Sequence, residues 1–347
     1  MANKDLKTDT ATLHNVATPW LDSPFNLLIQ SHQQGRLAHA LLLTGSDGVG
    51  KYKLAKKLAN YLLCSNETDQ LEACGHCHAC QLFAVGNHLD FHLLKHGTTK
   101  SIGVDQVRSL ISVLNERPNL GTNKVVIIKN TQELTIAAAN ALLKTLEEPQ
   151  GNSYLILVAN NSHQLMPTLI SRVQHTHIHT PDDKTLLQWI GEQGFCLSDQ
   201  GIIKLFQNSP LSLLNHLQGN QDSALIDERR SCVEGVFGIL NQPETLFDFS
   251  KFLAESADRR LQLLFFLFHD LHKLKLADWV EYNESIYHFA QPQLEIWKNQ
   301  LNLKSLREMS ADILTLRQQI NTHRALRKEL LISALLIKIK NKFNLSG

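Results

Sequence analysis

Short runs of apolar and β-branched residues recur along the first half of the chain, and most of them end at a glycine, an asparagine or a charged residue. Apolar runs of roughly four to eight residues with such boundaries are typical of buried strands in a parallel sheet. The pattern predicts five strands, at 39–45, 90–94, 124–129, 153–160 and 175–179.

Helical spacing replaces this pattern between the runs. Apolar residues recur every three or four positions from Tyr52 to Leu63, and similar patterns cover roughly 104–116 and 133–147. Strands that alternate with helices are typical of a mostly parallel sheet with helices on both faces. We therefore expect the first half of the chain to form an α/β domain.

The strand-like runs disappear after the segment "TPDD" at 180–183. The segment 184–194 is predicted to be a helix that stops at a glycine, and the segments 259–280 and 326–343 have the periodicity of a helical bundle. A chain of 347 residues exceeds the size that one core usually serves, so two or three domains are expected. The predicted fold class is α/β followed by all-α.

Composition and charge narrow the class of protein. The net charge is +1 at pH 7 and 43% of the residues are hydrophobic, which is typical of a globular protein and excludes a strongly basic one held on nucleic acid by bulk charge. Residues 1–18 are polar and are expected to form a disordered lead-in, without a signal peptide. The apolar run at 263–268 is too short to span a bilayer, so we expect a cytoplasmic protein with no membrane partner.

The segment "GSDGVGKYKL" at 45–54 is almost a phosphate-binding loop. It matches G-x-x-x-x-G-K and lies between a predicted strand and a predicted helix, but Tyr52 stands where Ser or Thr would hold Mg²⁺. The strand that should supply acidic residues for the same ion ends in Lys129 and Asn130. These two losses predict that the chain does not hydrolyse ATP.

Three interpretations of this loop remain. The flanking strand and helix disfavour a chance glycine loop. Weak binding of nucleotide is the second interpretation, and a retained shape that needs no nucleotide is the third, which we favour. The vestigial nucleotide-binding residues would be Gly45, Gly48, Gly50 and Lys51.

Four of the six cysteines lie close together in the sequence, and they are Cys64, Cys74, Cys77 and Cys80. In a chain without a secretion signal, clustered thiols favour a metal over disulfides. Four thiolates around a tetrahedral zinc ion make a closed, structural site. His76 and His78 could compete as ligands, and reduced free thiols are the alternative to zinc.

Several stretches are similar to one protein family. They include "LGTNKVVII" at 120–128, "AAANALLKTLEEP" at 137–149 and "LISRV" at 169–173, together with the degenerate loop and "CGHCHAC". With the segment 19–45 they span most of residues 19–181. Over this region the chain resembles the delta-prime subunit family of the bacterial DNA polymerase III clamp loader, whose members are AAA+ proteins. The C-terminal third is similar only in size and helical character.

The resemblance implies three domains. A RecA-like AAA+ domain at 19–181 would carry a zinc module at 64–80, a helical lid would cover 182–219, and a helical collar at 220–347 would join five subunits in an open ring. Members of the family are rigid stators, so no intrinsic activity is expected of this chain within an assembly that has DNA polymerase and clamp-loader ATPase activity. The implied partners are gamma/tau-type ATPase subunits and the delta subunit, with the sliding clamp and primed DNA reached through the complex.

The family's Ser-Arg-Cys motif corresponds to Ser171, Arg172 and Val173. Its arginine reaches the ATP of a neighbouring subunit, as an arginine finger supplied in trans. Val173 departs from the family's cysteine, but the guanidinium rather than the thiol stabilises phosphoryl charge. Asn160 matches the family's sensor of the γ-phosphate, whereas the second sensor, an arginine in the lid, has no counterpart at 208–215.

Two other functions remain as alternatives. An autonomous gamma/tau-type ATPase motor would need carboxylates at 129 and 130 and a hydroxyl at 52. A zinc-dependent nucleic-acid-binding module would need a basic surface around the cysteines, yet the segment 65–80 contains no Lys or Arg.

Two further groups of side chains are assigned to the solvated surface. His175, His177 and His179 alternate, so they would share one face of a strand, and we favour a solvated or interface role over a metal site. Glu147 and Glu148 are expected to form a solvated helix end.

Overall fold

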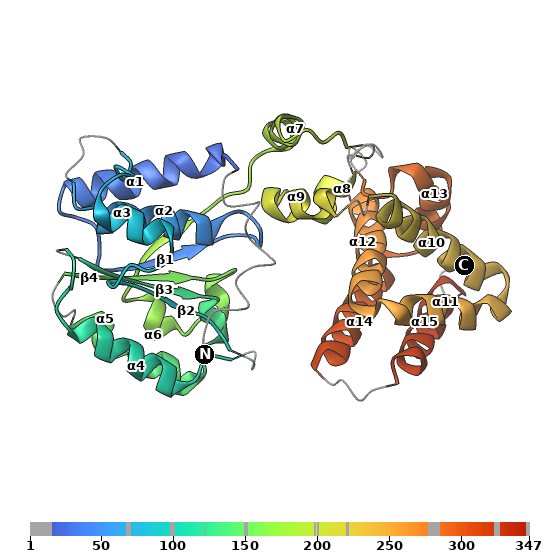
Figure 1. The fold of residues 1–347 in the computed structure, drawn as a ribbon. Helices are drawn as coiled ribbons and strands as arrows, with labels where there is room; N and C mark the ends of the chain where they lie inside the picture. The colour runs from blue at the N-terminus through green and yellow to red at the C-terminus, as the bar shows by residue number, and fades with distance from the viewer. Residues whose placement is uncertain are drawn as a thin grey trace. The chain divides into compact units, whose positions relative to one another are not determined.

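The computed structural model describes most of the chain, namely residues 16–66, 71–97, 101–121, 123–148, 152–197, 199, 201–219, 222–276, 285–322 and 327–344. The lead-in predicted at 1–18 therefore lies outside the described residues as far as residue 15. Contacts within the chain define two compact units, Met1–Trp189 with Gln207–Asn215 and Ile190–Phe206 with His216–Gly347 (Figure 1). The three domains with the boundaries given above stay a prediction.

A sheet of five parallel strands forms the centre of the first unit. The strands lie in the order β2, β3, β4, β1 and β5, so β1 is an inner strand and β5 is an edge. All five predicted strands are confirmed, with ends that differ from the prediction by one or two residues at most. The strands are β1 (Ala40–Thr44), β2 (Phe91–Leu94), β3 (Lys124–Lys129), β4 (Ser153–Val158) and β5 (Gln174–His177).

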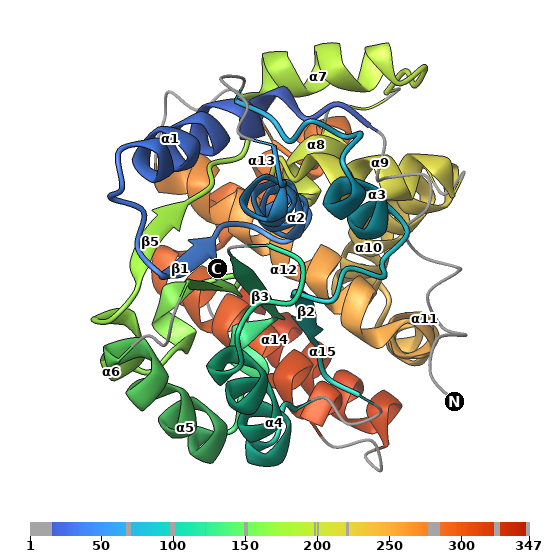
Figure 2. The ribbon, with the colours of Figure 1, turned by 60° about the vertical axis from the view of Figure 1, so that its left-hand side comes forward.

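Helices cover both faces of this sheet (Figure 2). Successive strand residues point to opposite faces, so Leu41 and Leu43 belong to one apolar core and Ala40 and Leu42 to the other. The helices on the first face are α1 (Asp22–Gln33), α2 (Lys51–Leu63) and α3 (His78–Ala84), and those on the second are α4 (Val104–Asn115), α5 (Ile136–Glu147) and α6 (Pro167–Ile170). The predicted α/β class is confirmed for this unit.

Thr135 sets the start of α5. The helix predicted over 133–147 begins later, because Thr131–Glu133 forms a short 3₁₀ turn, η2. Thr135 Oγ1 then accepts a hydrogen bond from the backbone N–H of Ala138 at 3.2 Å. A threonine in this position satisfies a free donor of the first turn, which fixes the helix start at the next residue.

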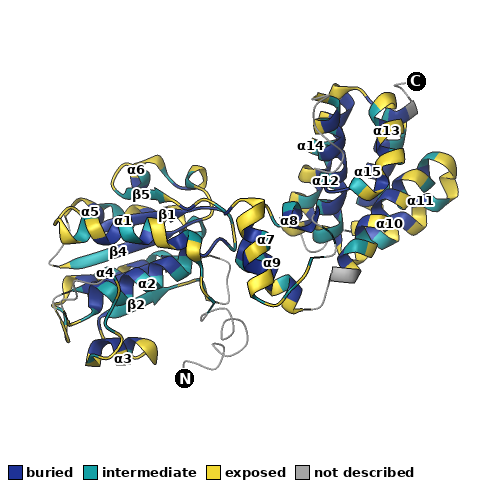
Figure 3. Ribbon diagram, turned by 90° about the horizontal axis from the view of Figure 1, so that it is seen from above, coloured by how far each residue is buried: buried dark blue, intermediate teal, exposed yellow. Residues whose placement is uncertain are grey.

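The second unit is helical throughout the part that the structure describes. Its helices have a buried stripe and an exposed stripe, as expected of an amphipathic bundle (Figure 3). They are α8 (Gly201–Leu205), α10 (Asp222–Asn241), α11 (Leu246–Glu255), α12 (Ala257–Leu276), α13 (Gln291–Gln300), α14 (Leu303–Thr322) and α15 (Lys328–Asn344). Both units share α7 (Asp183–Glu192) and α9 (Pro210–Gln218).

The remaining elements are short 3₁₀ turns, η1 (Pro19–Leu21), η3 (Ser162–Gln164), η4 (Pro243–Thr245) and η6 (His288–Ala290). Within the bundle, α12 packs against α14 and α11 packs against α15. No described helix combines the length and the mean hydropathy that crossing a bilayer requires.

Candidate functional site

The glycine-rich loop connects β1 to α2 at the carboxyl edge of the sheet. Gly45, Gly48 and Gly50 all have positive φ angles, of 150°, 76° and 103°. A Cβ at Gly45 would lie 2.5 Å from the carbonyl oxygen of Ile178, and one at Gly48 would lie 1.9 Å from Ser212 Oγ. Only glycine fits these two places without displacing backbone or side chain.

Lys51 is turned back into its own loop. Its ammonium Nζ donates hydrogen bonds to the carbonyl oxygens of Gly45 at 2.8 Å and Ser46 at 2.7 Å. The residue is buried, and burial lowers its pKa to about 8, with Asp47 acting in the opposite direction. The ammonium that would bind phosphates in a working loop is therefore bound by the protein itself.

Tyr52 and Lys129 line the cavity at the positions where a working site would supply ligands to Mg²⁺. Lys129 Nζ lies 5.2 Å from the centroid of the Tyr52 ring, within the range of a cation–π interaction. Asn130 has a left-handed backbone, and its side-chain amide donates to Glu133 Oε1 at 3.0 Å. The surrounding cavity has a volume of about 200 Å³, below the roughly 300–1,000 Å³ of typical ligand pockets. Among its described lining residues, Asp47 is the only carboxylate.

Groups from other segments brace the loop from outside. The backbone N–H of Leu211, at the start of α9, donates to the carbonyl oxygen of Gly48 at 3.0 Å. The indole N–H of Trp20 donates to the carbonyl oxygen of Val49 at 2.8 Å, and its ring meets that of Trp189 edge-on at 4.9 Å. These contacts are missed by sequence reasoning, which noted only that 208–215 has no arginine.

Asn160, the residue expected at the sensor position, also contacts the loop. Its carbonyl oxygen accepts a hydrogen bond from the backbone N–H of Gly45 at 3.4 Å, and the residue lines the same cavity. Asn160 therefore supports the loop through its backbone, at the position where the resemblance implies a sensor of the γ-phosphate.

Arg172 is held at the end of α6 by a network of hydrogen bonds. Its Nε and Nη2 lie 2.7 and 2.6 Å from Glu147 Oε1, and its Nη1 donates to the carbonyl oxygen of Thr168 at 2.9 Å and to Ser171 Oγ at 3.1 Å. Its side chain remains 34% exposed. Glu147 is the last residue of α5 and its side chain is half exposed, so the predicted solvated helix end is confirmed, and the structure adds the pairing of this carboxylate with Arg172.

Arg172 and the glycine-rich loop lie at opposite ends of the parallel strands, Arg172 at the amino ends and the loop at the carboxyl ends. Arg172 precedes β5, whereas the loop follows β1, and these neighbouring strands are parallel, with Leu41 paired to Gln174 and Thr44 to His177. At about 3.3 Å per residue, the four residues from Leu41 to Gly45 alone separate the start of β5 at Gln174 from the loop by roughly 13 Å along the sheet. The guanidinium therefore does not belong to the cavity of its own loop.

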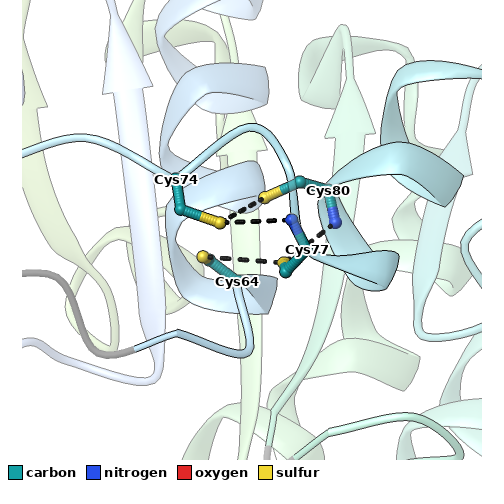
Figure 4. A group of neighbouring side chains, drawn as sticks. All are labelled: Cys64, Cys74, Cys77 and Cys80. Atoms are coloured by element: carbon teal, nitrogen blue, oxygen red, sulfur yellow. Dashed lines mark hydrogen bonds between the residues drawn. The ribbon is translucent and has the colours of Figure 1, made fainter.

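The four clustered cysteines converge between the end of α2 and the start of α3 (Figure 4). All four Sγ atoms lie within 4.8 Å of one another, with separations of 3.9 Å for Cys64–Cys77 and 4.0 Å for Cys74–Cys80. Four thiolates about 2.3 Å from a tetrahedral zinc ion would be about 3.8 Å apart. The arrangement therefore fits a four-thiolate metal site.

The four thiols differ in their surroundings: against the effect of burial, hydrogen bonds lower the pKa of Cys74 and Cys77, whereas burial raises the pKa of Cys64 and Cys80. The N–H groups of Cys77 and Cys80 each lie 3.4 Å from the sulfur of the cysteine three positions earlier. Burial raises the pKa of the Cys77 thiol, but hydrogen bonds from the backbone N–H groups of Cys80 and Ser65 outweigh it and hold this pKa at about 6. Thiolates are the form that binds metal.

The neighbouring histidines are not part of this arrangement. Among the described residues, the four cysteines are the only group of three or more metal-binding side chains whose ligand atoms lie close together. His76 Nδ1 is instead hydrogen-bonded to the carbonyl oxygen of Cys74 at 2.8 Å. Bound zinc would tie the end of α2 to α3 and would have no open coordination position.

The three alternating histidines are exposed along β5 and just beyond it. His175 Nε2 and His177 Nδ1 share the hydroxyl of Thr44, at 2.7 and 3.1 Å. Burial lowers the pKa of His177, and the neighbouring His179 lowers it further. In the part of the chain that is described, these side chains form no group that meets the geometry of a metal site.

An inner parallel strand that leads into a glycine-rich loop and a helix N-terminus is the arrangement of a phosphate-binding loop, so the first unit belongs to the class of α/β proteins built around such a loop. Residues 21–182 match the family described as "DNA polymerase III, delta subunit".

Individual relatives extend this match over nearly the whole chain. The chain is 31% identical to DNA polymerase III subunit delta' of Escherichia coli, over 93% of this chain and 95% of that protein. It is 35% identical to the protein of the same name from Yersinia pestis, over 74% and 76%. It is 27% identical to DNA polymerase III subunit tau/gamma of Haemophilus influenzae, over 60% of this chain and 31% of that protein. The chain belongs to the family of DNA polymerase III delta' subunits.

Proposed function

We propose that this chain is a non-catalytic subunit of the DNA polymerase III clamp loader that presents Arg172 to ATP bound by a neighbouring subunit. The position of Arg172 carries this proposal. The guanidinium is partly exposed and held in one orientation, and it lies at the edge of the sheet opposite its own glycine-rich loop. A phosphate that it contacts must therefore belong to another molecule.

The network around Arg172 suggests how it would act. The contacts with Glu147, Thr168 and Ser171 use most of the five N–H donors of the guanidinium. A half-exposed ion pair of this kind contributes about 1 kcal/mol or less, so the larger charge of a transferring phosphoryl group would displace Glu147. The guanidinium would then stabilise the charge that develops on the γ-phosphate.

The state of the chain's own loop supports a stator rather than a motor. Lys51 is bound by loop carbonyls, and Tyr52 and Lys129 line the cavity at the positions where a working site would supply ligands to Mg²⁺. No observation favours an autonomous gamma/tau-type motor or a zinc-dependent nucleic-acid-binding module. The proposed partners are gamma/tau-type ATPase subunits and the delta subunit, with the sliding clamp and primed DNA reached through the complex.

Zinc at Cys64, Cys74, Cys77 and Cys80 would have a structural role in this proposal. The polymerase and ATPase activities would belong to the assembly, and ATP binding by this chain would be vestigial.

The test is a reconstituted loader in which only the ATPase subunit beside this chain can hydrolyse ATP. Arg172→Ala should lower turnover at that site by roughly 10³-fold or more, and Arg172→Lys should restore little of it, because a lysine lacks the planar fork. Arg108→Ala is the matched control, since Arg108 is an exposed arginine on α4. An unchanged rate for Arg172→Ala in a fully assembled complex would refute the assignment.

A second measurement separates the stator from the motor. The purified chain should show no ATP turnover above background, and Lys51→Ala should leave the activity of the assembled loader unchanged. Turnover by the chain alone that Lys51→Ala abolishes would establish a motor instead.

A further inference from the structure

A hollow lies on the outer side of α2, between the start of α1 and the end of α3, and Figure 2 looks nearly along α2 with these two helices on either side. Its volume is about 500 Å³, which is in the range of ligand-binding pockets. Its polar lining consists of Thr18, Asp22, Lys53, Lys56, Lys57 and Asn60. The glycine-rich loop does not contribute to this lining, although Lys53 borders both cavities.

One of the three lysines already has partners. Lys57 Nζ lies 3.6 Å from Asp22 Oδ1 and 3.0 Å from Glu72 Oε1, and 4.4 Å from the centroid of the Phe25 ring. Its charge, and that of Asp22 in the lining, are therefore compensated within the protein.

Lys53 and Lys56 have no carboxylate partner among the described residues. Lys53 Nζ donates to the carbonyl oxygen of Val16, and Lys56 Nζ lies 5.9 Å from the centroid of the Phe83 ring. Burial lowers the pKa of both ammonium groups, and repulsion from Lys57 adds to the effect at Lys53. The hollow therefore contains two half-buried ammonium groups that have no paired carboxylate, and the three lysines together with Asp22 and Glu72 carry a net charge of +1.

We propose that this hollow binds phosphate groups, either a condensed inorganic phosphate or adjacent phosphates of a nucleic-acid strand. Two ammonium groups without a carboxylate partner can each donate to a phosphate group, which carries a charge of up to about −2 at neutral pH, and the net positive charge of the hollow favours such an anion. Lysine, threonine and asparagine are the side chains that commonly contact phosphate oxygens.

The geometry of α2 supports the same ligand. Lys53 and Lys56 are three positions apart, which puts their Cβ atoms about 5–6 Å from each other on one helix face. Asn60 is the next polar residue of that face, one turn further, and Thr18 supplies a hydroxyl from the opposite wall. Donors thus line the hollow along about 10 Å of helix, a length that suits two neighbouring phosphates.

The first measurement uses the full chain and two probes. Binding of pyrophosphate is detected by the line width of its phosphorus NMR signal. Binding of a fluorescein-labelled oligothymidylate of about twenty nucleotides is detected by fluorescence anisotropy. Release of counterions by two lysines predicts a slope of log K against log salt of about −1.4 for the single strand. Binding of the oligonucleotide without pyrophosphate assigns the site to nucleic acid, and the reverse result assigns it to free condensed phosphate.

Variants then locate the site. The double variant Lys53→Gln/Lys56→Gln should weaken binding at least tenfold and flatten the salt dependence. Lys56→Gln alone should weaken binding severalfold. Because Lys56 lines the hollow but not the cavity of the glycine-rich loop, this single variant distinguishes the two sites. Lys304→Gln, at an exposed lysine of α14, is the matched control. Failure of both probes to bind, wild-type binding by the double variant, or equal competition by polyglutamate would overturn the proposal.

Discussion

Loss of the metal from the cysteine cluster should unfold the module around α3 and lower the stability of the first unit. The perturbation is Cys77→Ser, which removes one thiolate from a set whose sulfur separations of 3.9 and 4.0 Å match a zinc site. A three-thiolate remnant holds zinc far more weakly than the closed site, so the variant should be purified without metal.

The magnitude follows from what α3 buries. Its buried side chains are Ala79, Cys80 and Phe83, and the ring of Phe83 packs against that of Phe91 at 4.8 Å. Exposure of one phenylalanine costs about 1.5–3 kcal/mol, and the small side chains add about 1 kcal/mol. A loss of about 2–4 kcal/mol in a unit of this size lowers Tm by roughly 5–15 °C.

The assay combines metal analysis with thermal unfolding of the first unit. Wild-type protein should contain about one zinc per chain, and Cys77→Ser should contain none and unfold at the lower temperature. Cys196→Ser is the matched control, since Cys196 is exposed and lies outside the cluster. A Cys77→Ser protein that keeps its zinc, or that loses zinc with Tm unchanged within about 1 °C, would refute the structural metal site.

Three further predictions concern Arg172 and the glycine-rich loop, which lie at opposite ends of the strands. Glu147→Gln should release Arg172 and speed its modification by phenylglyoxal, whereas Glu148→Gln should leave the rate unchanged. The free energy of unfolding should change by less than about 1 kcal/mol in either variant, because the ion pair of Glu147 and Arg172 is half exposed. Equal rates of modification in the two variants would contradict this prediction. Lys51 has a folded pKa of about 8 and an unfolded pKa near 10.4, so the unfolded chain binds more protons between these values and stability should rise with pH across the window, by at most about 3 kcal/mol. Lys51→Met should flatten that part of the stability curve, as measured by Tm against pH, and an unaltered slope would count against the buried ammonium. Gly48→Ala should cost at least about 2 kcal/mol, because a Cβ there meets Ser212 at a positive φ angle, and wild-type denaturant unfolding would exclude that contact.

The order of elements in the first unit could be predicted from the sequence because local patterns determine it. Five strand runs and the intervening helical periodicity give a parallel sheet with helices on both faces, and the structure confirms them. The start of α5 was placed too early because apolar periodicity does not reveal a capping residue. Thr135 caps the first turn of α5 by accepting a hydrogen bond from the backbone N–H of Ala138, and this bond depends on one side chain rather than on a repeating pattern.

In the candidate sites too, features that depend on local sequence could be predicted, whereas contacts between distant residues could not. The cysteines could be grouped from their spacing, and the loss of Mg²⁺ ligands could be read directly at Tyr52 and Lys129. The pairing of Glu147 with Arg172 could not, because it joins residues 25 positions apart through the packing of α5 and α6. The hydrogen bonds that Leu211 and Trp20 donate to carbonyl oxygens of the glycine-rich loop could not be predicted either, because one residue lies far after the loop in the sequence and the other lies before it.

These non-local contacts bear on how a degenerate loop can serve a stator. A ligand shifts a conformational equilibrium only through a difference in its affinity for the two states. In the first unit, the Lys51 ammonium, which would otherwise be free to bind a phosphate, donates to two loop carbonyl oxygens, and the backbone N–H of Leu211 donates to a third. A phosphate would have to draw Lys51 away from its carbonyl oxygens, whereas the hydrogen bond from Leu211 to Gly48 does not compete with phosphate, so we expect nucleotide to have little effect on the position of α9 against the loop. We infer that this part of the unit keeps one arrangement whatever the nucleotide concentration, as the proposed role of Arg172 in trans requires.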